Sequence, residues 1–228
     1  MNNRINEIDV LRGTAVILML LFHTFVDLYD FFGTGINYHT GIIYFVGRTA
    51  AFTFIFVSGV SAVLGKNNLK NAACVFLAGL LVTLVTYFFD ANTFVIFGVL
   101  QFLSSCMLIY HFLKKCPSYL FLIFSAAAFF VGMLINGHTA PFYWLLPFGI
   151  YPDTFKTVDY YPIFPYISLF FLGNFFGKTV YKKRIPLIRN FDIIPLSFLG
   201  RHSLVIYLIH QPIIYGILYF ILQIIKMT

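Results

Sequence analysis

The chain has 228 residues, of which 60% are hydrophobic and only 10% are charged. A soluble domain carries about 25% charged residues, so this composition excludes a soluble globular protein. The net charge of +7 does not indicate nucleic-acid binding, because in a membrane protein the location of each charge matters more than their sum.

Seven apolar segments approach or exceed the roughly 20 residues that a helix needs to cross a bilayer. They are 9–29, 42–64, 70–89, 93–113, 117–136, 162–181 and 202–225. The first is too long for the apolar part of a signal peptide, and we expect it to remain as the first span. The sequence therefore predicts an all-α, polytopic transmembrane helix bundle of about seven spans, with residues 1–228 in a single domain.

The longest connection, residues 137–161, reads GHTAPFYWLLPFGIYPDTFKTVDYY. It contains Trp144, three prolines and several tyrosines. Aromatic rings of this kind favour the headgroup level of a membrane. We expect a loop that carries a short interfacial or re-entrant helix.

Basic residues divide unequally between the two sides that seven spans define. Twelve fall on the side of the N-terminus and three on the other, and an excess of Lys and Arg marks the cytoplasmic side. The twelve are Arg4, Arg12, Lys66, Lys70, Lys114, Lys115, Lys178, Lys182, Lys183, Arg184, Arg189 and Arg201; the three are Arg48, Lys156 and Lys226. The N-terminus is therefore predicted to be cytoplasmic and the 137–161 loop external. The basic segment GKTVYKKRIPLIRNF has two interpretations, attraction to anionic lipid headgroups or contact with a phosphate-bearing cytosolic ligand.

Two ionisable residues, His23 and Asp27, interrupt the first apolar segment in LMLLFHTFVDLYDFF. A spacing of four places both side chains on one helix face. A carboxylate beside an imidazole fixes its tautomer and raises its basicity, as a general base requires. The alternative is a structural polar pair that joins two helices.

Further polar residues occur in or next to the apolar segments. Arg48 lies in the outer part of the second one, where an unpaired guanidinium is costly, and we expect it to pair with Asp27 or to hold an anionic group. His39 precedes that segment. His210 lies in the last one, and Pro212 after it frees a backbone carbonyl. The three cysteines are scattered, and neither they nor the histidines have a metal-ligand spacing, so no metal is predicted.

Five motifs, in the same order, resemble those of one family, the heparan-alpha-glucosaminide N-acetyltransferase catalytic-domain family, in its short prokaryotic branch. The motifs are RINEIDVLRGTAVILMLLFHTFVDL, FTFIFVSGVSAVLG, VIFGVLQFLSS, DYYPIFPYISLFFLGNFFG and LGRHSLVIYLIHQPIIYGI. The first is also similar to the wider class of transmembrane acyltransferases. The apolar spans imply an integral protein in contact with the lipid bilayer, and a small bundle with this much aromatic surface is suited to forming a homodimer. The short-branch resemblance implies that the membrane is a prokaryotic plasma membrane.

The resemblance also implies that an acetyl group passes from cytosolic acetyl-CoA to a saccharide or similar acceptor on the external side. A histidine on that far side is central to the family's chemistry. The matching position falls at or beside His39, and His23 is the rival candidate, which we favour because Asp27 can orient it. His23 then removes a proton from the acceptor or takes the acetyl group itself, and Arg48 stabilises the oxyanion.

Two further sets of residues complete this hypothesis. The residues expected to bind the CoA phosphates are Arg12, Lys182, Lys183, Arg184 and Arg201. Those expected to line the substrate passage are Ser58, Gln101, Tyr160, His210 and Gln211. The alternatives are a transporter or proton-coupled channel, in which His23 and Asp27 relay protons, and an inactive partner subunit.

Overall fold

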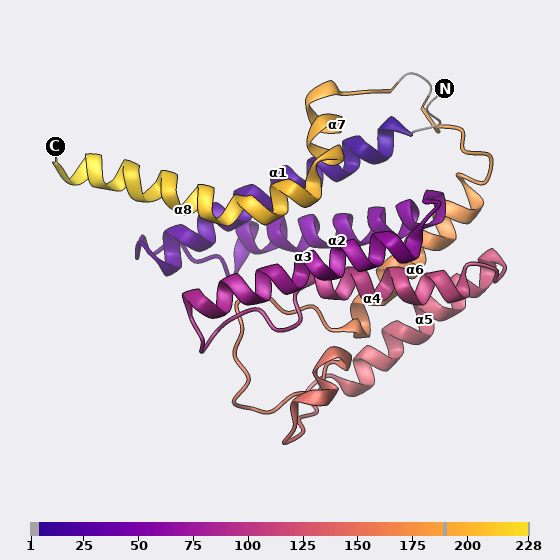
Figure 1. Ribbon diagram of the computed structural model, residues 1–228, viewed down its shortest axis with the longest axis horizontal. Helices are drawn as coiled ribbons and strands as arrows, with labels where there is room; N and C mark the ends of the chain where they lie inside the picture. The colour runs from indigo at the N-terminus through magenta and orange to yellow at the C-terminus, as the bar shows by residue number, and fades with distance from the viewer. Residues whose placement is uncertain (1–4, 189–190, 228) are drawn as a thin grey trace. The chain divides into compact units, whose positions relative to one another are not determined.

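The computed structural model describes residues 5–188 and 191–227, and within them it is built from helices (Figure 1). Arg4 and Arg189, two of the residues counted for the orientation, lie outside the described ranges. The helices are α1 (Asn6–Asp30), α2 (Gly41–Leu64), α3 (Asn68–Phe89), α4 (Val99–Leu113), α5 (Ser118–Ile135), η1 (Tyr143–Phe148), α6 (Ile163–Thr179), α7 (Ile194–Arg201) and α8 (Ser203–Met227). The all-α prediction is confirmed.

Five helices are long and apolar enough to cross a membrane: α1, α2, α3, α5 and α8. They match five of the seven predicted spans. The other two, α4 and α6, have 15 and 17 residues. The chain is therefore an integral membrane protein by its helices, and the count of seven stays a prediction.

The sequence placed the start of one helix wrongly and missed one short helix. The predicted span 93–113 begins only at Val99, because an Asp159 carboxylate oxygen accepts the Val99 N–H at 3.1 Å and Gln101 Oε1 accepts the Gly98 N–H at 3.1 Å. These bonds satisfy N–H groups that a helix start leaves without partners. Helix α7 was not predicted, because its segment is short and adjoins the basic loop.

The chain forms two compact units, Met1–Phe54 with Pro186–Thr228, and Ile55–Ile185. In the first unit, α7 packs against the N-terminal part of α1 (Figure 1). The helices approach closely because Gly13 faces the Leu196 carbonyl and Gly200 faces the Asp9 carbonyl. A Cβ atom at either glycine would collide with backbone, which explains why both positions lack a side chain.

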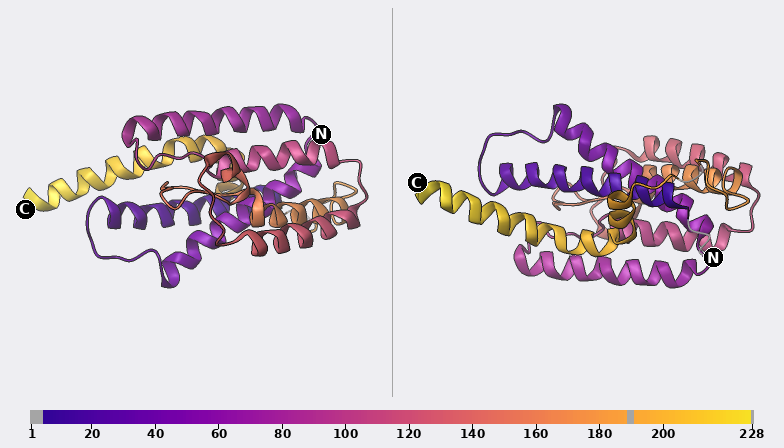
Figure 2. Two further views of the ribbon diagram at one scale, coloured as in Figure 1. Left: turned by 90° about the horizontal axis from the view of Figure 1, so that it is seen from below. Right: turned by 90° about the horizontal axis from the view of Figure 1, so that it is seen from above.

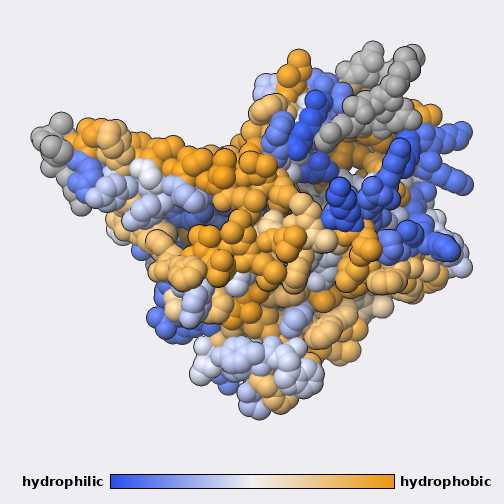
Figure 3. Space-filling model, in the orientation of Figure 1, coloured by the Kyte–Doolittle hydropathy of each residue, from blue (hydrophilic) through white to orange (hydrophobic). Residues whose placement is uncertain are grey.

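Helix α8 runs parallel to α1 in the same unit. Gln211 contacts Asp27, and one turn later the Tyr215 ring lies 5.3 Å from the Phe31 ring. Both views of Figure 2 show the C-terminal part of α8 extending beyond α1. Its surface there is coloured mostly hydrophobic in Figure 3. The large apolar side chains exposed on this part of α8 include Ile213, Ile217, Phe220, Ile221 and Ile224. Such a surface is suited to contact with lipid.

In the second unit, α5 runs antiparallel to α6. Ser125 Oγ donates to the Ser168 carbonyl at 2.8 Å, and Gly132 faces Pro165. The second half of α2 runs parallel to α6, since Gly59 and Gly173 lie in close contact and Asn174 Nδ2 donates to the Gly59 carbonyl at 2.7 Å.

The 137–161 stretch contains the 3₁₀ helix η1, so a short helix in this loop is confirmed. Tyr160 holds it by donating its hydroxyl to the Leu146 carbonyl at 2.6 Å. Burial and the neighbouring Tyr151 and Tyr166 raise the pKa of Tyr160. This phenol therefore stays protonated and keeps its hydrogen bond. The interfacial or re-entrant placement of η1 stays a prediction.

Candidate functional site

Four polar residues from α1 and α8 meet within the first unit. Asp27 is 0% exposed and His210 is 7% exposed, whereas His23 and Gln211 are half-buried. The two histidine rings lie 4.8 Å apart between centroids, tilted by 57°. The parallel course of the two helices thus joins residues that are up to 188 positions apart in the sequence.

Asp27 has its hydrogen-bond partner on α8. Gln211 Nε2 donates to Asp27 Oδ1. The other carboxylate oxygen, Oδ2, and the Gln211 Oε1 atom are buried and have no hydrogen-bond partner among the described residues. The expectation that Asp27 orients His23 is therefore corrected, because the short aspartate side chain turns toward the opposite helix.

His210 is held by its own helix. Its Nδ1 lies 2.6 Å from the Tyr207 carbonyl oxygen. A carbonyl oxygen only accepts hydrogen bonds, so Nδ1 carries a proton, and in the neutral ring Nε2 then carries a lone pair. This Nε2 is buried and has no hydrogen-bond partner in the described part of the chain.

The site therefore presents three buried acceptors, Asp27 Oδ2, Gln211 Oε1 and His210 Nε2. A buried polar atom without a partner costs about 1–3 kcal/mol, so such atoms in a native fold call for an explanation. An O–H or N–H donor, from a ligand or from a neighbouring side chain, would satisfy each of them. The arrangement thus fits a hydroxyl- or amine-bearing ligand, and a neutral imidazole can accept a proton from it.

The other two predicted catalytic residues, Arg48 and His39, lie in the same unit. Arg48 is half-buried, donates from Nε to the Tyr44 hydroxyl at 3.0 Å, and lies 5.2 Å from the Tyr44 ring centroid. His39 is exposed in the loop after α1, and its ring centroid lies 4.1 Å from that of Tyr38 with the ring planes tilted by 34°. Tyr38 is anchored to Asp30, and burial together with this carboxylate raises the pKa of Tyr38 to about 12.

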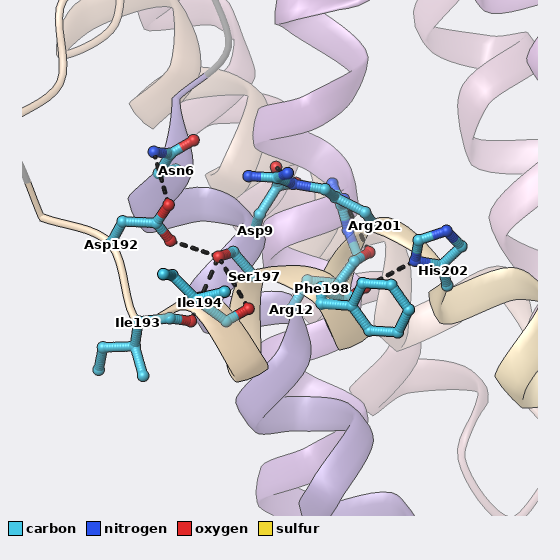
Figure 4. A network of polar contacts seen from close by, with 11 residues as sticks. Asn6, Asp9, Arg12, Asp192, Ile193, Ile194, Ser197, Phe198, Arg201 and His202 are labelled. Atoms are coloured by element: carbon cyan, nitrogen blue, oxygen red, sulfur yellow. Dashed lines mark hydrogen bonds and ion pairs between the residues drawn. The ribbon is translucent and has the colours of Figure 1, made fainter.

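Two of the predicted phosphate ligands, Arg12 and Arg201, share one carboxylate at the α1–α7 contact (Figure 4). Arg12 Nη1 lies 3.2 Å from Asp9 Oδ1, and Arg201 Nε lies 3.5 Å from Asp9 Oδ2. Arg12 also donates to the Gly200 carbonyl at 3.4 Å. Asp9 thus holds two guanidinium groups at the end of α1 where the N-terminus lies.

A second polar chain completes this network (Figure 4). Ser197 on α7 donates to Asp192 Oδ1, and Asn6 donates to Asp192 Oδ2 at 3.1 Å. Nearby, the Glu7 carboxylate accepts the N–H groups of Leu187 and Ile188 at 2.8 and 3.1 Å. The sequence analysis missed Glu7, Asp9 and Asp192. The spacing of Asp9 and Arg12, three residues apart on one helix face, is the signal that could have indicated the first pair.

The remaining predicted residues belong to the second unit. Lys182 and Lys183 are exposed, and Arg184 donates to the Leu64 carbonyl at 3.1 Å. Ser58 is buried. Gln101 ties α4 to α3 by donating from Nε2 to the Gly79 carbonyl at 2.9 Å and to Thr83 Oγ1 at 2.8 Å. A role in lining a passage stays a prediction for Ser58, Gln101 and Tyr160, and the latter two already have structural partners.

The bonds of Gln101 allow a direct test. Gln101→Ala removes the link to Gly79 and Thr83 and the bond to the Gly98 N–H. Because each such bond contributes about 0.5–1.5 kcal/mol, we expect a loss of roughly 2–4 kcal/mol in unfolding free energy, measured by denaturant titration in detergent. Gln223→Ala is the control, since that side chain is exposed on α8. Equal stability of the two variants would contradict the structural role.

Comparison with known proteins identifies the chain. The model of the heparan-alpha-glucosaminide N-acetyltransferase catalytic family matches residues 4–212. This range includes every residue of the α1–α8 cluster. No match was found among curated proteins or among solved structures. Since the match covers most of its length, the chain belongs to the heparan-alpha-glucosaminide N-acetyltransferase catalytic family.

Proposed function

We propose that this protein is a membrane acetyltransferase that moves an acetyl group from cytosolic acetyl-CoA to an external saccharide or similar acceptor. The observation that carries the proposal is the buried cluster of His23, Asp27, His210 and Gln211 between two apolar helices of a chain of this family. On the short-branch resemblance, the membrane is a prokaryotic plasma membrane.

The proposed chemistry needs one proton acceptor at the thioester. His23 takes the proton from the acceptor amine or hydroxyl while that nucleophile forms a bond to the acetyl carbon. The carbon–sulfur bond then breaks, and the CoA sulfur leaves with the proton from His23. Asp27 and Gln211 supply hydrogen-bond acceptors that hold the incoming donor groups in place.

Helix directions support seven spans with a cytoplasmic N-terminus. Within the first unit α1 and α8 are parallel. Within the second unit, the second half of α2 is parallel to α6, and α5 is antiparallel to α6. Helices that alternate in direction from α1 to α6 and end with α8 satisfy all these relations, and the twelve basic residues then share one side.

The donor is proposed to enter at that basic side. Arg12 and Arg201 form ion pairs with Asp9 on that side. His23 follows Arg12 by 11 residues, about 16 Å of helix rise. The long arm of CoA suits this geometry, with charged phosphates at the surface and the thioester deeper in the membrane.

The exposed Lys182 and Lys183 offer a test of donor binding. We expect the double variant Lys182→Ala/Lys183→Ala to weaken CoA binding about 2- to 30-fold, since each exposed ion pair contributes about 0.2–1 kcal/mol. Calorimetry on the purified protein in detergent measures the affinity, and added salt should reduce the difference. Lys114→Ala/Lys115→Ala is the matched control, which removes equal charge from exposed positions outside the proposed site.

Two outcomes would count against this account. If both double variants weakened CoA binding equally, the effect would come from the loss of positive charge in general and not from Lys182 and Lys183. Failure of the unaltered protein to bind either CoA or acetyl-CoA would contradict the donor and favour a transporter, in which the same histidines relay protons.

A further inference from the structure

We propose that His210 is a positioning residue for His23: its Nε2 accepts a hydrogen bond from a ring N–H of His23, and the other ring nitrogen of His23 then carries the reactive lone pair. The inference deepens the proposed function, on which it rests for the catalytic role of His23. In this arrangement His210, on α8, determines which ring nitrogen of His23, on α1, carries the proton.

His210 is suited to this task because its own state is fixed. The Tyr207 carbonyl, 2.6 Å from Nδ1, holds the proton on that nitrogen, so in the neutral ring Nε2 can only accept. The ring is buried. Gln211, the next residue of α8, is hydrogen-bonded to Asp27 of α1. This bond fixes the position of His210 along α1.

His23 needs such a partner. His23 is half-buried, and the structure shows no hydrogen bond between either of its ring nitrogens and any other described residue. A histidine base is oriented by the bond that its second nitrogen makes. Asp27, the carboxylate one turn away, is already bonded to Gln211.

The spacing of the rings fits a direct bond. Two imidazoles that share an N–H···N bond of about 2.9 Å have centroids about 5 Å apart, because each nitrogen lies about 1.1 Å from its ring centre. The observed separation is 4.8 Å at a tilt of 57°. Rotation of the unanchored His23 ring is therefore enough to align a donor with His210 Nε2.

The consequence for the reaction is a defined proton path. The acceptor N–H or O–H bond breaks as its proton moves to the free nitrogen of His23, and the same proton later goes to the sulfur of CoA. The proton shared with His210 stays on His23 throughout. His210 thus touches neither substrate, and it acts by keeping His23 in the receptive tautomer.

Two substitutions distinguish the roles of the two ring nitrogens of His210. His210→Asn keeps a donor for the Tyr207 carbonyl but has no acceptor at the position of Nε2. His210→Gln places an acceptor there. We expect His210→Asn to lower kcat about 10- to 100-fold with KM changed less than about threefold, and His210→Gln to recover most of the loss. His202→Asn is the matched control, since His202 makes a similar contact, Nδ1 to the Phe198 carbonyl at 2.9 Å, at an exposed position.

The tautomer of His23 can also be measured by spectroscopy, without an activity assay. In the ¹⁵N-histidine spectrum of the purified protein, with His23 assigned by its loss in His23→Gln, we expect a single tautomer of His23, which becomes a mixture in His210→Asn. A tautomer mixture in the unaltered protein, or a spectrum unchanged by His210→Asn, would overturn the inference, as would equal activity of the Asn and Gln variants. Absence of acetyl transfer by the unaltered protein would instead refute the proposed function and leave the tautomer result standing.

Discussion

Replacement of His23 by alanine is expected to lower kcat for acetyl transfer about 10²- to 10⁴-fold, the range contributed by a positioned general base. The fold should survive, because the His23 ring is half-buried and no described residue depends on it for a hydrogen bond. Binding of CoA should also survive, because Arg12 and Arg201, two of the proposed phosphate ligands, lie on Asp9 near the other end of α1. Release of CoA from acetyl-CoA in the presence of an amino sugar measures the effect.

His39→Ala is the control for that experiment, since His39 is the rival histidine. It is exposed, and its recorded contacts are with loop residues and Tyr29. We expect a change of less than about threefold in kcat. If His39→Ala abolished transfer while His23→Ala retained it, the assignment of the base to α1 would be wrong, and the loop before α2 would hold the site.

Replacement of Gly200 by alanine is expected to destabilise the protein by at least about 1–3 kcal/mol, the usual cost of overpacking. A Cβ atom there would collide with the Asp9 carbonyl, which is backbone and cannot rotate away. The same shift would pull Asp9 from Arg12 and Arg201, so we also expect weaker CoA binding.

Gly216→Ala on α8 is the matched control, because nothing lies within 4 Å of a Cβ at that position. Alanine favours a helix by about 0.8–1.0 kcal/mol over glycine, so this variant should be as stable as the unaltered protein or more so. Unfolding by denaturant in detergent compares the two. Equal stabilities would show that α7 does not pack on α1 through Gly200.

Local signals predicted the parts of the fold that depend on local sequence. Long apolar segments gave α1, α2, α3, α5 and α8, because hydropathy over about 20 residues decides whether a helix suits a membrane. The start of α4 was missed because it depends on Asp159, which is 60 residues away. Helix α7 was missed because its stability comes from glycine contacts with α1 rather than from its own length.

In the site, too, only the features that depend on local sequence were predicted. The spacing of His23 and Asp27 identified two polar residues on one face of α1. Their partners, His210 and Gln211, were named only as lining residues, because no local pattern shows that α8 runs parallel to α1. The bond between Gln211 and Asp27 spans 184 residues. Likewise, only the folded chain shows that Arg12 and Arg201 share Asp9.

The most direct test of the account is acetyl transfer across a membrane. Vesicles containing the purified protein would enclose glucosamine, and acetyl-CoA with a labelled acetyl group would be added outside. We expect labelled product inside, one CoA released outside for each acetyl group transferred, and neither with His23→Ala. CoA release that is no greater for the unaltered protein than for His23→Ala would contradict the claim that this cluster catalyses acetyl transfer.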